Sequence, residues 1–316
     1  MTDLHVVDAG PEEADDVVDV IHAAFGARPH LDPPSSAQHE TRAAVAATLA
    51  EHGGLLARVG GRPAGALLFQ PNGSELWLRR VGVDPRLQHR GVASSLVGCA
   101  EEVAAERGYD TVSLTARVEL PATQRFWLRR GYLEASRSGP KIVYSKAIPV
   151  DLDVPTADDT HELGARLGAA LVAGDVVLLT GELGAGKTTL TQGIGHGLQV
   201  RGPVTSPTFV IARLHPSLVD GPPLVHVDAY RLGSADELDD LDLEMSLDDA
   251  VTVVEWGEGR AEPLSADRLD VVIRRHRGGD PDGSDGRHVK VTPVGPRWLG
   301  ISLRTSLGTS LPTALG

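Results

Sequence analysis

The sequence has little cysteine and no long hydrophobic run. Cys99 is the single cysteine among 316 residues, which excludes an intramolecular disulfide and a cysteine-based metal cluster. The first residues lack the basic segment and apolar core of a signal peptide, and no apolar stretch approaches the length that a membrane span needs. We therefore expect a cytoplasmic protein with no membrane partner.

Lysine is scarce as well, and acidic side chains outnumber basic ones. Four of the 30 basic residues are lysines, so a lysine inside a motif indicates that the motif needs an ammonium group. The net charge is −13, of which residues 151–316 carry −11, from 14 basic and 25 acidic side chains. An acidic half repels phosphate backbones, so we expect it to bind a protein rather than nucleic acid directly. The 12 histidines show no zinc-ligand spacing.

The strand and helix signals divide the chain near residue 150, and 316 residues suit two domains. Both halves are predicted to be α/β. For 1–148 we expect a mixed β-sheet with flanking helices. For 151–295 we expect a three-layer α/β/α domain, because a fully apolar strand at 176–180 is followed by alternating helix and strand signals. The remainder, 296–316, is rich in Ser, Thr, Leu and Gly and is predicted to be a mobile tail.

Residues 181–188 match the P-loop pattern G-x-x-x-x-G-K-[ST] completely. They follow the buried strand and precede a predicted helix at 189–198, so backbone N–H groups and a helix N-terminus would surround a phosphate. Lys187 would reach the β- and γ-phosphates of ATP, and the Thr188 hydroxyl would bind Mg²⁺. The predicted nucleotide-binding residues are Gly181, Glu182, Leu183, Gly184, Ala185, Gly186, Lys187, Thr188 and Thr189.

Two carboxylates follow apolar strands in this half of the chain. Asp228 ends the predicted strand 224–228, and Glu255 ends the predicted strand 251–255. Ligands of open α/β sheets bind at the carboxyl ends of the strands, so both side chains are candidates for the Mg²⁺ shell. One of them would hold the metal and the other would orient the attacking water.

The order of four motifs resembles the bacterial TsaE family, the ATPase subunits of threonylcarbamoyladenosine biosynthesis on tRNA. These motifs are the P-loop, Ser-Pro-Thr-Phe at 206–209, His-Val-Asp-Ala-Tyr-Arg at 226–231 and Val-Glu-Trp at 254–256. The resemblance implies that Thr208 acts in a switch-like loop, that Glu255 is a magnesium or catalytic residue, and that Trp256 lies close to the nucleotide. It also implies a place for Thr160 on the base side.

The same resemblance implies partners of the TsaB and TsaD type. TsaD performs the transfer to tRNA, so this chain would meet tRNA only through the complex, and ATP hydrolysis would reset that complex. We find no arginine finger by spacing, which predicts slow intrinsic hydrolysis. An acidic stretch at 236–249 either faces a partner or is a solvated loop.

The first half contains a second anion-binding signature at 88–93, where a basic, Gly-containing loop opens a predicted helix at 92–107. This pattern resembles the acetyl-CoA pyrophosphate loop of GCN5-related N-acetyltransferases (GNATs), and the resemblance covers about 4–148. It implies that the strand 76–83 splays from its neighbour and that its backbone holds the acetyl and pantetheine groups. The residues expected to bind the cofactor are Val81, Val83, Gln88, His89, Arg90, Gly91, Val92 and Ala93.

The residues for proton transfer depart from the GNAT pattern. Trp127 stands where many relatives have a tyrosine, and Leu120 stands near the position of a common asparagine. Acetyl transfer needs a base for the amine proton, and Glu75 is the nearest candidate. The half is either an acetyltransferase that uses water as its proton relay or a CoA-binding module without turnover, and its acceptor is unknown.

The sequence thus predicts an acetyltransferase-like domain fused to a tRNA-modification ATPase, with ATP, Mg²⁺ and acetyl-CoA as cofactors. Two alternatives stay open. One is a P-loop kinase of a small molecule, which should show lid arginines and an acceptor pocket. The other is an interaction protein whose assembly with partners is controlled by binding of nucleotide and acyl-CoA, without turnover of either.

Overall fold

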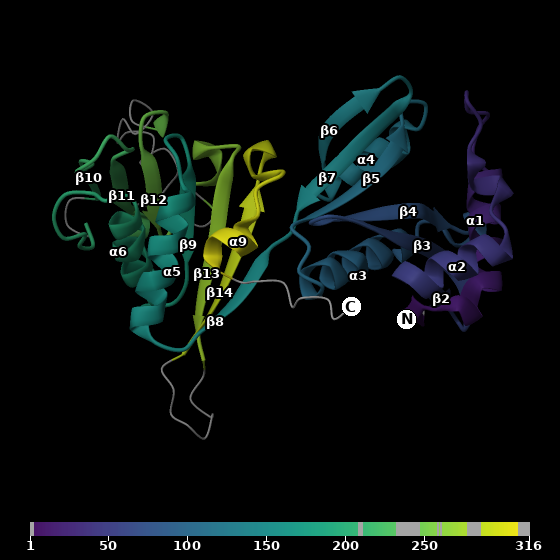
Figure 1. Cartoon of the computed structure of the whole chain (residues 1–316), viewed down its shortest axis with the longest axis horizontal. Helices are drawn as coiled ribbons and strands as arrows, with labels where there is room; N and C mark the ends of the chain where they lie inside the picture. Colours follow the sequence, from purple (N-terminus) through teal and green to yellow (C-terminus); the bar gives the residue numbers. More distant parts are fainter. Residues whose placement is uncertain are drawn as a thin grey trace. The chain divides into compact units, whose positions relative to one another are not determined.

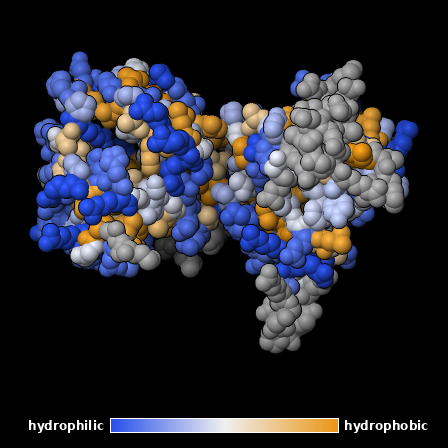
Figure 2. Space-filling model, turned by 180° about the vertical axis from the view of Figure 1, so that it is seen from behind, coloured by the Kyte–Doolittle hydropathy of each residue, from blue (hydrophilic) through white to orange (hydrophobic). Residues whose placement is uncertain are grey.

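The computed structural model describes residues 3–207, 211–231, 247–257, 259, 261–276 and 286–308. Its internal contacts divide the chain into two compact units, Met1–Ile148 and Pro149–Gly316 (Figure 1). Each unit is built on one seven-stranded mixed sheet. Hydrophobic residues lie scattered among hydrophilic ones on the faces that Figure 2 shows, and no helix in the described ranges is long and apolar enough to cross a membrane.

The sheet of unit 1 has the strand order β1-β2-β3-β4-β5-β7-β6, and neighbours are antiparallel except for the parallel pair β4 and β5. Its strands are β1 Leu4–Ala9, β2 Gly54–Val59, β3 Arg62–Asn72, β4 Glu75–Val83, β5 Thr111–Arg117, β6 Leu133–Ser138 and β7 Lys141–Ala147. Its helices are α1 Ala14–Gly26, α2 Arg42–His52, α3 Val92–Glu106 and α4 Pro121–Arg129, with 3-10 turns η1 Pro11–Glu13, η2 Ser36–His39 and η3 Pro85–Leu87.

The parallel pair β4 and β5 forms a fork. The two strands pair only from Glu75 opposite Thr111 to Leu78 opposite Leu114. Beyond Leu78, β4 carries a bulge, because its pairing with β3 shifts register between Ala66 and Leu68. Arg80 lies in this bulge with a left-handed φ of 55°. Bulges bend a strand and often lie beside binding sites, and this one opens the splay expected of β4.

The sheet of unit 2 has the order β10-β11-β12-β9-β13-β14-β8. Strands β11, β12, β9 and β13 run parallel in the centre, and the outer strands are antiparallel to their neighbours. The strands are β8 Val150–Val154, β9 Val176–Thr180, β10 Ala212–His215, β11 Leu224–Asp228, β12 Val251–Glu255, β13 Arg268–Arg275 and β14 Arg287–Val294. The helices are α5 Ala157–Ala170, α6 Lys187–Gly197 and α9 Leu303–Leu307, with 3-10 turns η4 Ala229–Arg231, η5 Glu262–Leu264 and η6 Pro296–Trp298.

Helices α5 and α6 approach each other at backbone distance. A Cβ atom added to Gly193 of α6 would lie 2.0 Å from the carbonyl oxygen of His161, and one added to Gly164 of α5 would lie 2.3 Å from that of Leu190. Only glycine fits such a contact. The close crossing fixes where α6 begins, and α6 begins at the end of the P-loop.

Residues 296–308 are ordered against unit 2, so the prediction of a mobile tail is wrong for this stretch. Trp298 is 1% exposed, and Leu303 and Leu307 of α9 are buried. Arg297 donates from Nε to the buried carboxylate of Asp175 at 3.1 Å, and Arg166 of α5 donates to the carbonyl of Leu307. The prediction relied on the overall composition of the segment, in which Ser, Thr and Gly outweigh the three apolar side chains that are buried here. Residues 309–316 lie outside the described part of the chain.

We expect Gly193→Ala to loosen the contact between α5 and α6, because the added methyl group overpacks a backbone contact at a cost of about 1–3 kcal/mol. Hydrogen–deuterium exchange should show faster exchange across both helices. Gly98→Ala is the control, since a Cβ at Gly98 in α3 meets no atom closer than 3.9 Å. Unchanged protection in Gly193→Ala would contradict the close crossing.

Candidate functional site

The loop after β9 and the first turn of α6 enclose a pocket of about 450 Å³. Gly186 caps α6 in a left-handed conformation with φ 110°, and its place at the N-cap supplies no side-chain acceptor for the first turn of the helix. Backbone N–H groups and the helix dipole therefore favour an anion there. The residues of the predicted phosphate loop that line the pocket are Leu183, Gly184, Gly186, Lys187, Thr188 and Thr189.

The ammonium of Lys187 is held by its own loop. Nζ donates to the carbonyls of Gly181 at 2.8 Å and Glu182 at 3.1 Å, and it lies 3.5 Å from the centre of the Trp256 ring. Burial lowers the pKa of Lys187, while the charges of Glu255 and Asp228 oppose that shift. An anion in the pocket would compete with two carbonyl oxygens and a ring for this cation.

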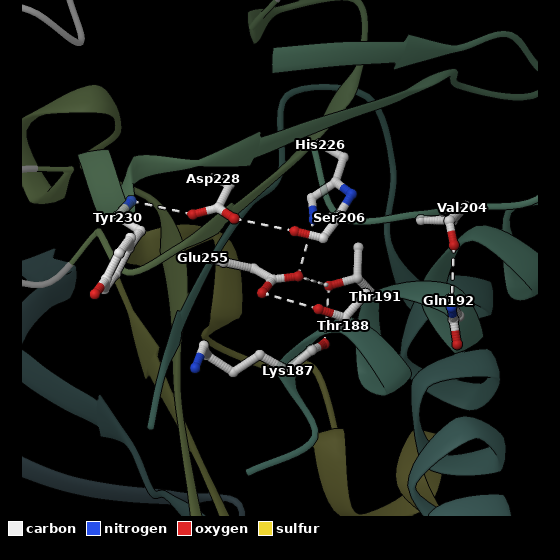
Figure 3. Close-up of polar contacts among 10 residues, drawn as sticks. All are labelled: Lys187, Thr188, Thr191, Gln192, Val204, Ser206, His226, Asp228, Tyr230 and Glu255. Carbon is white, nitrogen blue, oxygen red and sulfur yellow. Dashed lines mark hydrogen bonds and ion pairs between the residues drawn. The ribbon is translucent and has the colours of Figure 1, made fainter. Parts of the chain in front are cut away.

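The two predicted carboxylates meet at the edge of the sheet, because the parallel register places Asp228 opposite Glu255. Asp228 accepts from the Ser206 hydroxyl at 3.0 Å and from the N–H of Tyr230 at 3.1 Å. Both carboxylates are almost fully buried and line the pocket beside Lys187. Figure 3 shows them facing the P-loop from β11 and β12.

Glu255 is the centre of a hydrogen-bond network (Figure 3). It accepts from the hydroxyls of Thr188 at 3.2 Å and Thr191 at 3.3 Å, both on α6. His226 of β11 contacts it through Nε2 at 2.9 Å. A buried carboxylate needs such donors, because an unpaired one would lose its hydration without compensation.

His226 is fully buried, and its Nδ1 has no hydrogen-bond partner among the described residues. The tautomer with the proton on Nε2 donates to Glu255 and leaves only a lone pair without a partner. His226 and Thr191 both contact Oε1 of Glu255, while Thr188 contacts Oε2, so β11 and α6 hold the same carboxylate.

The oxygen atoms at this edge suit Mg²⁺. Thr188, Asp228 and Glu255 offer a hydroxyl and two carboxylates to one pocket. In proteins Mg²⁺ commonly binds one or two carboxylates together with water and substrate phosphates. Among the described residues there is no group of three or more His, Cys, Asp or Glu side chains that would hold a metal without a phosphate ligand.

Arg287 was not predicted, yet it lines the same pocket. It is buried at the start of β14, and its Nε donates to the carbonyl of Ala185 in the P-loop at 3.1 Å. The two residues are 102 positions apart. No local pattern could indicate this contact, because it depends on β14 lying two strands from β9.

Three other predictions for this half have different outcomes. Trp256 lines the pocket with a strained left-handed φ of 62° and an edge-on contact to Tyr230. Thr160 is buried, donates to the carbonyl of Thr156, and does not line this pocket, so its role on the base side stays a prediction. Thr208 and most of the acidic stretch 236–249 lie outside the described residues.

Unit 1 holds a second pocket of about 450 Å³ at the fork of β4 and β5. Gly91 caps α3 in a left-handed conformation with φ 82°, so the first turn of α3 offers its N–H groups as α6 does. The predicted cofactor residues that line this pocket are Val81, Val83, Gln88, His89, Gly91, Val92 and Ala93. Arg90 is exposed and lies outside the lining.

A third pocket of about 320 Å³ also lies at the fork. Arg28, Val81, Thr123 and Trp127 line both it and the second pocket. Trp127 is buried with its ring edge-on to Tyr132 at 5.0 Å. The Tyr132 hydroxyl lies in neither lining, and burial raises its pKa well above the ordinary value.

Glu75 is misplaced for the role of base. It begins β4 and accepts from the Trp77 indole at 2.8 Å, and it lines neither pocket of unit 1. Six residues of strand separate it from Val81, or roughly 20 Å at about 3.3 Å per residue. Glu75 was predicted as the base because it is close in sequence to the residues expected to bind the cofactor. It lies at the opposite end of β4 from Val81, away from both pockets.

The fold and these pockets define an acetyltransferase-type domain followed by a P-loop nucleotide-binding domain. The family model "Acetyltransferase (GNAT) family" matches residues 17–132, and "Threonylcarbamoyl adenosine biosynthesis protein TsaE" matches 154–281. The chain is 66% identical over 139 residues to the tRNA threonylcarbamoyladenosine biosynthesis protein TsaE of Streptomyces coelicolor, covering 44% of this chain and 93% of that protein. The chain belongs to the TsaE family and carries a GNAT domain fused in front.

Two solved structures resemble one unit each. Bacillus subtilis YdiB is 31% identical and covers 51% of this chain and 94% of its own, with a TM-score of 0.40. The PaiA N-acetyltransferase of Thermoplasma acidophilum, solved with coenzyme A, is 13% identical and covers 46% and 98%, with a TM-score of 0.42.

We expect MgADP to change the fluorescence of Trp256, because a phosphate in the P-loop would draw the Lys187 ammonium away from the ring. A titration of the full chain followed by tryptophan emission measures this. Trp256→Phe should lose the change, and Trp77→Phe in unit 1 should keep it. A full-amplitude change in Trp256→Phe would show that another tryptophan reports the binding.

Proposed function

We propose that unit 2 binds ATP with Mg²⁺ and hydrolyses it in support of tRNA threonylcarbamoyladenosine synthesis. The observation that carries this proposal is the Glu255 network, which joins the P-loop helix to β11 and β12 around one pocket. The family of the chain supports the tRNA-modification setting.

Each residue of the pocket has a role in this proposal. The N–H groups of the P-loop and the ammonium of Lys187 hold the phosphates. Thr188 and Asp228 supply oxygen ligands for the metal, which neutralises charge that develops on the phosphates. Glu255, fixed by His226 and the threonines, orients the attacking water and accepts its proton.

We propose that proteins of the TsaB and TsaD type complete the site, and that tRNA meets this chain only through them. The net charge of −11 over 151–316 supports a protein partner over direct tRNA binding. Arg287, the arginine among the described lining residues, already donates from Nε to a P-loop carbonyl. Arg275 lies beside the loop as well, with Nη1 3.8 Å from the place that a Cβ of Gly184 would take. In this proposal a partner supplies further charge for the transition state.

We propose that unit 1 binds acetyl-CoA in the pocket lined by the start of α3 and transfers the acetyl group to an amine. The left-handed glycine at the start of α3 and the fork of β4 support this. With Trp127 and Leu120 at the positions of common proton-transfer groups, water would carry the amine proton.

The test is MgATP turnover by the full chain, alone and with the TsaB- and TsaD-type proteins of the same organism. We expect turnover to rise with the partners. Lys187→Ala and Glu255→Gln should each lower it by about 100-fold or more, since they remove phosphate contacts and the base. Glu162→Gln, an exposed change on α5, is the matched control.

Three results would speak against this proposal. Normal turnover in both variants would remove the site assignment. ATP consumption that requires a small phosphate acceptor would favour the kinase. Tight nucleotide binding with no turnover, with or without partners, would favour the interaction protein that ligands gate.

We expect His226→Leu to lower kcat by about 10–100-fold, because it removes the donor that orients Glu255. The affinity for ATP should change less than about threefold, since His226 does not line the pocket. His226→Gln restores a donor at similar reach and should recover part of kcat. His288→Gln, which changes an unrelated histidine on β14, is the control. If His226→Gln and His288→Gln lowered kcat equally, His226 would have no positioning role.

A further inference from the structure

The third pocket, between the fork strands of unit 1, is lined by positive charge. Among its described lining residues are five cations, and none is Asp, Glu, His or Tyr. They come from the segment that follows α1, from β4 at its bulge, from the end of β5 and from the start of β7. These cations are Arg28, Arg79, Arg80, Arg117 and Lys141.

Two of these cations are already neutralised. Arg80 pairs with Glu40 at 2.6 Å and also donates to Ser36 at 3.0 Å. Arg117 pairs with Glu119 and donates to the carbonyls of Asp32 and Pro33. These contacts hold the rim of the pocket.

Arg28 has no carboxylate partner among the described residues. Its Nη2 donates to the carbonyl of Val81 at 3.3 Å, and its guanidinium lies 3.6 Å from the centre of the Phe25 ring. Burial, together with the nearby charge of Arg80, lowers the pKa of Arg28 to about 10, so it stays protonated at neutral pH. A half-buried cation without an anion favours a ligand that brings one.

The position of Arg28 links the two pockets of the fork. It lines both, together with Val81, Thr123 and Trp127. On the proposed function, the acetyl group of acetyl-CoA lies at Val81, and the acceptor enters from the third pocket. Arg28 would then bind an anionic group of the acceptor that lies only a few bonds from the acceptor's amine.

The lining also constrains the amine itself. With no carboxylate, histidine or tyrosine in the described lining, the amine must lose its proton to water. The α-amine at the start of a polypeptide has an ordinary pKa of about 8, whereas a lysine amine has one of about 10.4. The surrounding positive charge lowers either value further, but only the α-amine becomes substantially neutral near pH 7.

We propose that the acetyl acceptor of unit 1 is an α-amine that carries a carboxylate side chain, bound through Arg28. This inference rests on the proposed acetyl transfer and names its substrate class. The lower pKa of a polypeptide amino terminus favours a polypeptide that begins with an acidic residue. A free acidic amino acid offers the same two groups on a more basic amine, and the experiment separates the two sources.

The reaction balances without a further reactant. The neutral amine nitrogen attacks the carbonyl carbon of the acetyl thioester, the N–C bond forms, and the C–S bond breaks. The nitrogen passes one proton to water, and the CoA thiolate takes a proton from water. The products are the N-acetylated acceptor and free CoA.

The experiment measures kcat/KM of the full chain with acetyl-CoA and matched pairs of acceptors. Glutamate is compared with glutamine, and a peptide beginning with aspartate is compared with one beginning with asparagine. A lysine peptide with a blocked N-terminus tests side-chain acetylation. We expect a preference of about tenfold or more for the acidic member of the pair that is the source.

Because Arg28 also lines the cofactor pocket, Arg28→Gln is judged by the ratio of the two acceptors: kcat/KM should fall about tenfold more for the acidic acceptor than for its amide partner, chiefly through KM. Arg62→Gln, an exposed arginine at the start of β3, removes the same charge far from the fork strands' pocket and should change neither. Binding of CoA to each variant, measured by calorimetry, checks that the domain is folded.

The possible results distinguish failure of this inference about the acceptor from failure of the proposed acetyl transfer by unit 1. Equal use of acidic and amide acceptors, preference for the lysine peptide, or an equal loss of both acceptors in Arg28→Gln would overturn the inference. So would acetyl-CoA binding with none of these amines acetylated. Failure of wild-type chain to bind acetyl-CoA would instead overturn the proposed function of unit 1, and the inference with it.

Discussion

The buried carboxylate of Glu255 joins segments of unit 2 that lie far apart in the sequence. It accepts from Thr188 and Thr191 of the P-loop helix and from His226 of the neighbouring strand. Because a buried charge without donors is costly, these contacts constrain one another. The network therefore ties the P-loop helix, β11 and β12 together around the pocket.

Both units present the N-terminus of a helix to a pocket where an anion could bind. In each, a helix begins at a glycine with a left-handed backbone, Gly91 in α3 and Gly186 in α6. Neither glycine has a side chain to accept from the first turn, so the N–H groups there are available to a phosphate. The difference lies in the neighbouring strands. Unit 2 places two carboxylates beside its helix, whereas unit 1 opens a fork lined by arginines.

Features that depend on residues close together in the sequence could be predicted, whereas features that depend on distant residues could not. The P-loop, Asp228 and Glu255 lie in short motifs after apolar strands, and parallel strands bring such ends together. Glu75 was assigned by sequence proximity alone, and the direction of β4 overturned it. The tail was judged by composition, which conceals the burial of Trp298 and Leu303.

The sequence by itself determined the two α/β halves, the phosphate loop with its lysine, and the families that they resemble, because these depend on local spacing and periodicity. Only the tertiary structure decided that Arg287 supports the P-loop, that His226 holds Glu255, and that Arg28 lines both pockets of the fork. Each of these contacts joins residues brought together by strand order, register or a bulge. No local pattern encodes such a pairing, because its energy appears only once the sheet has formed.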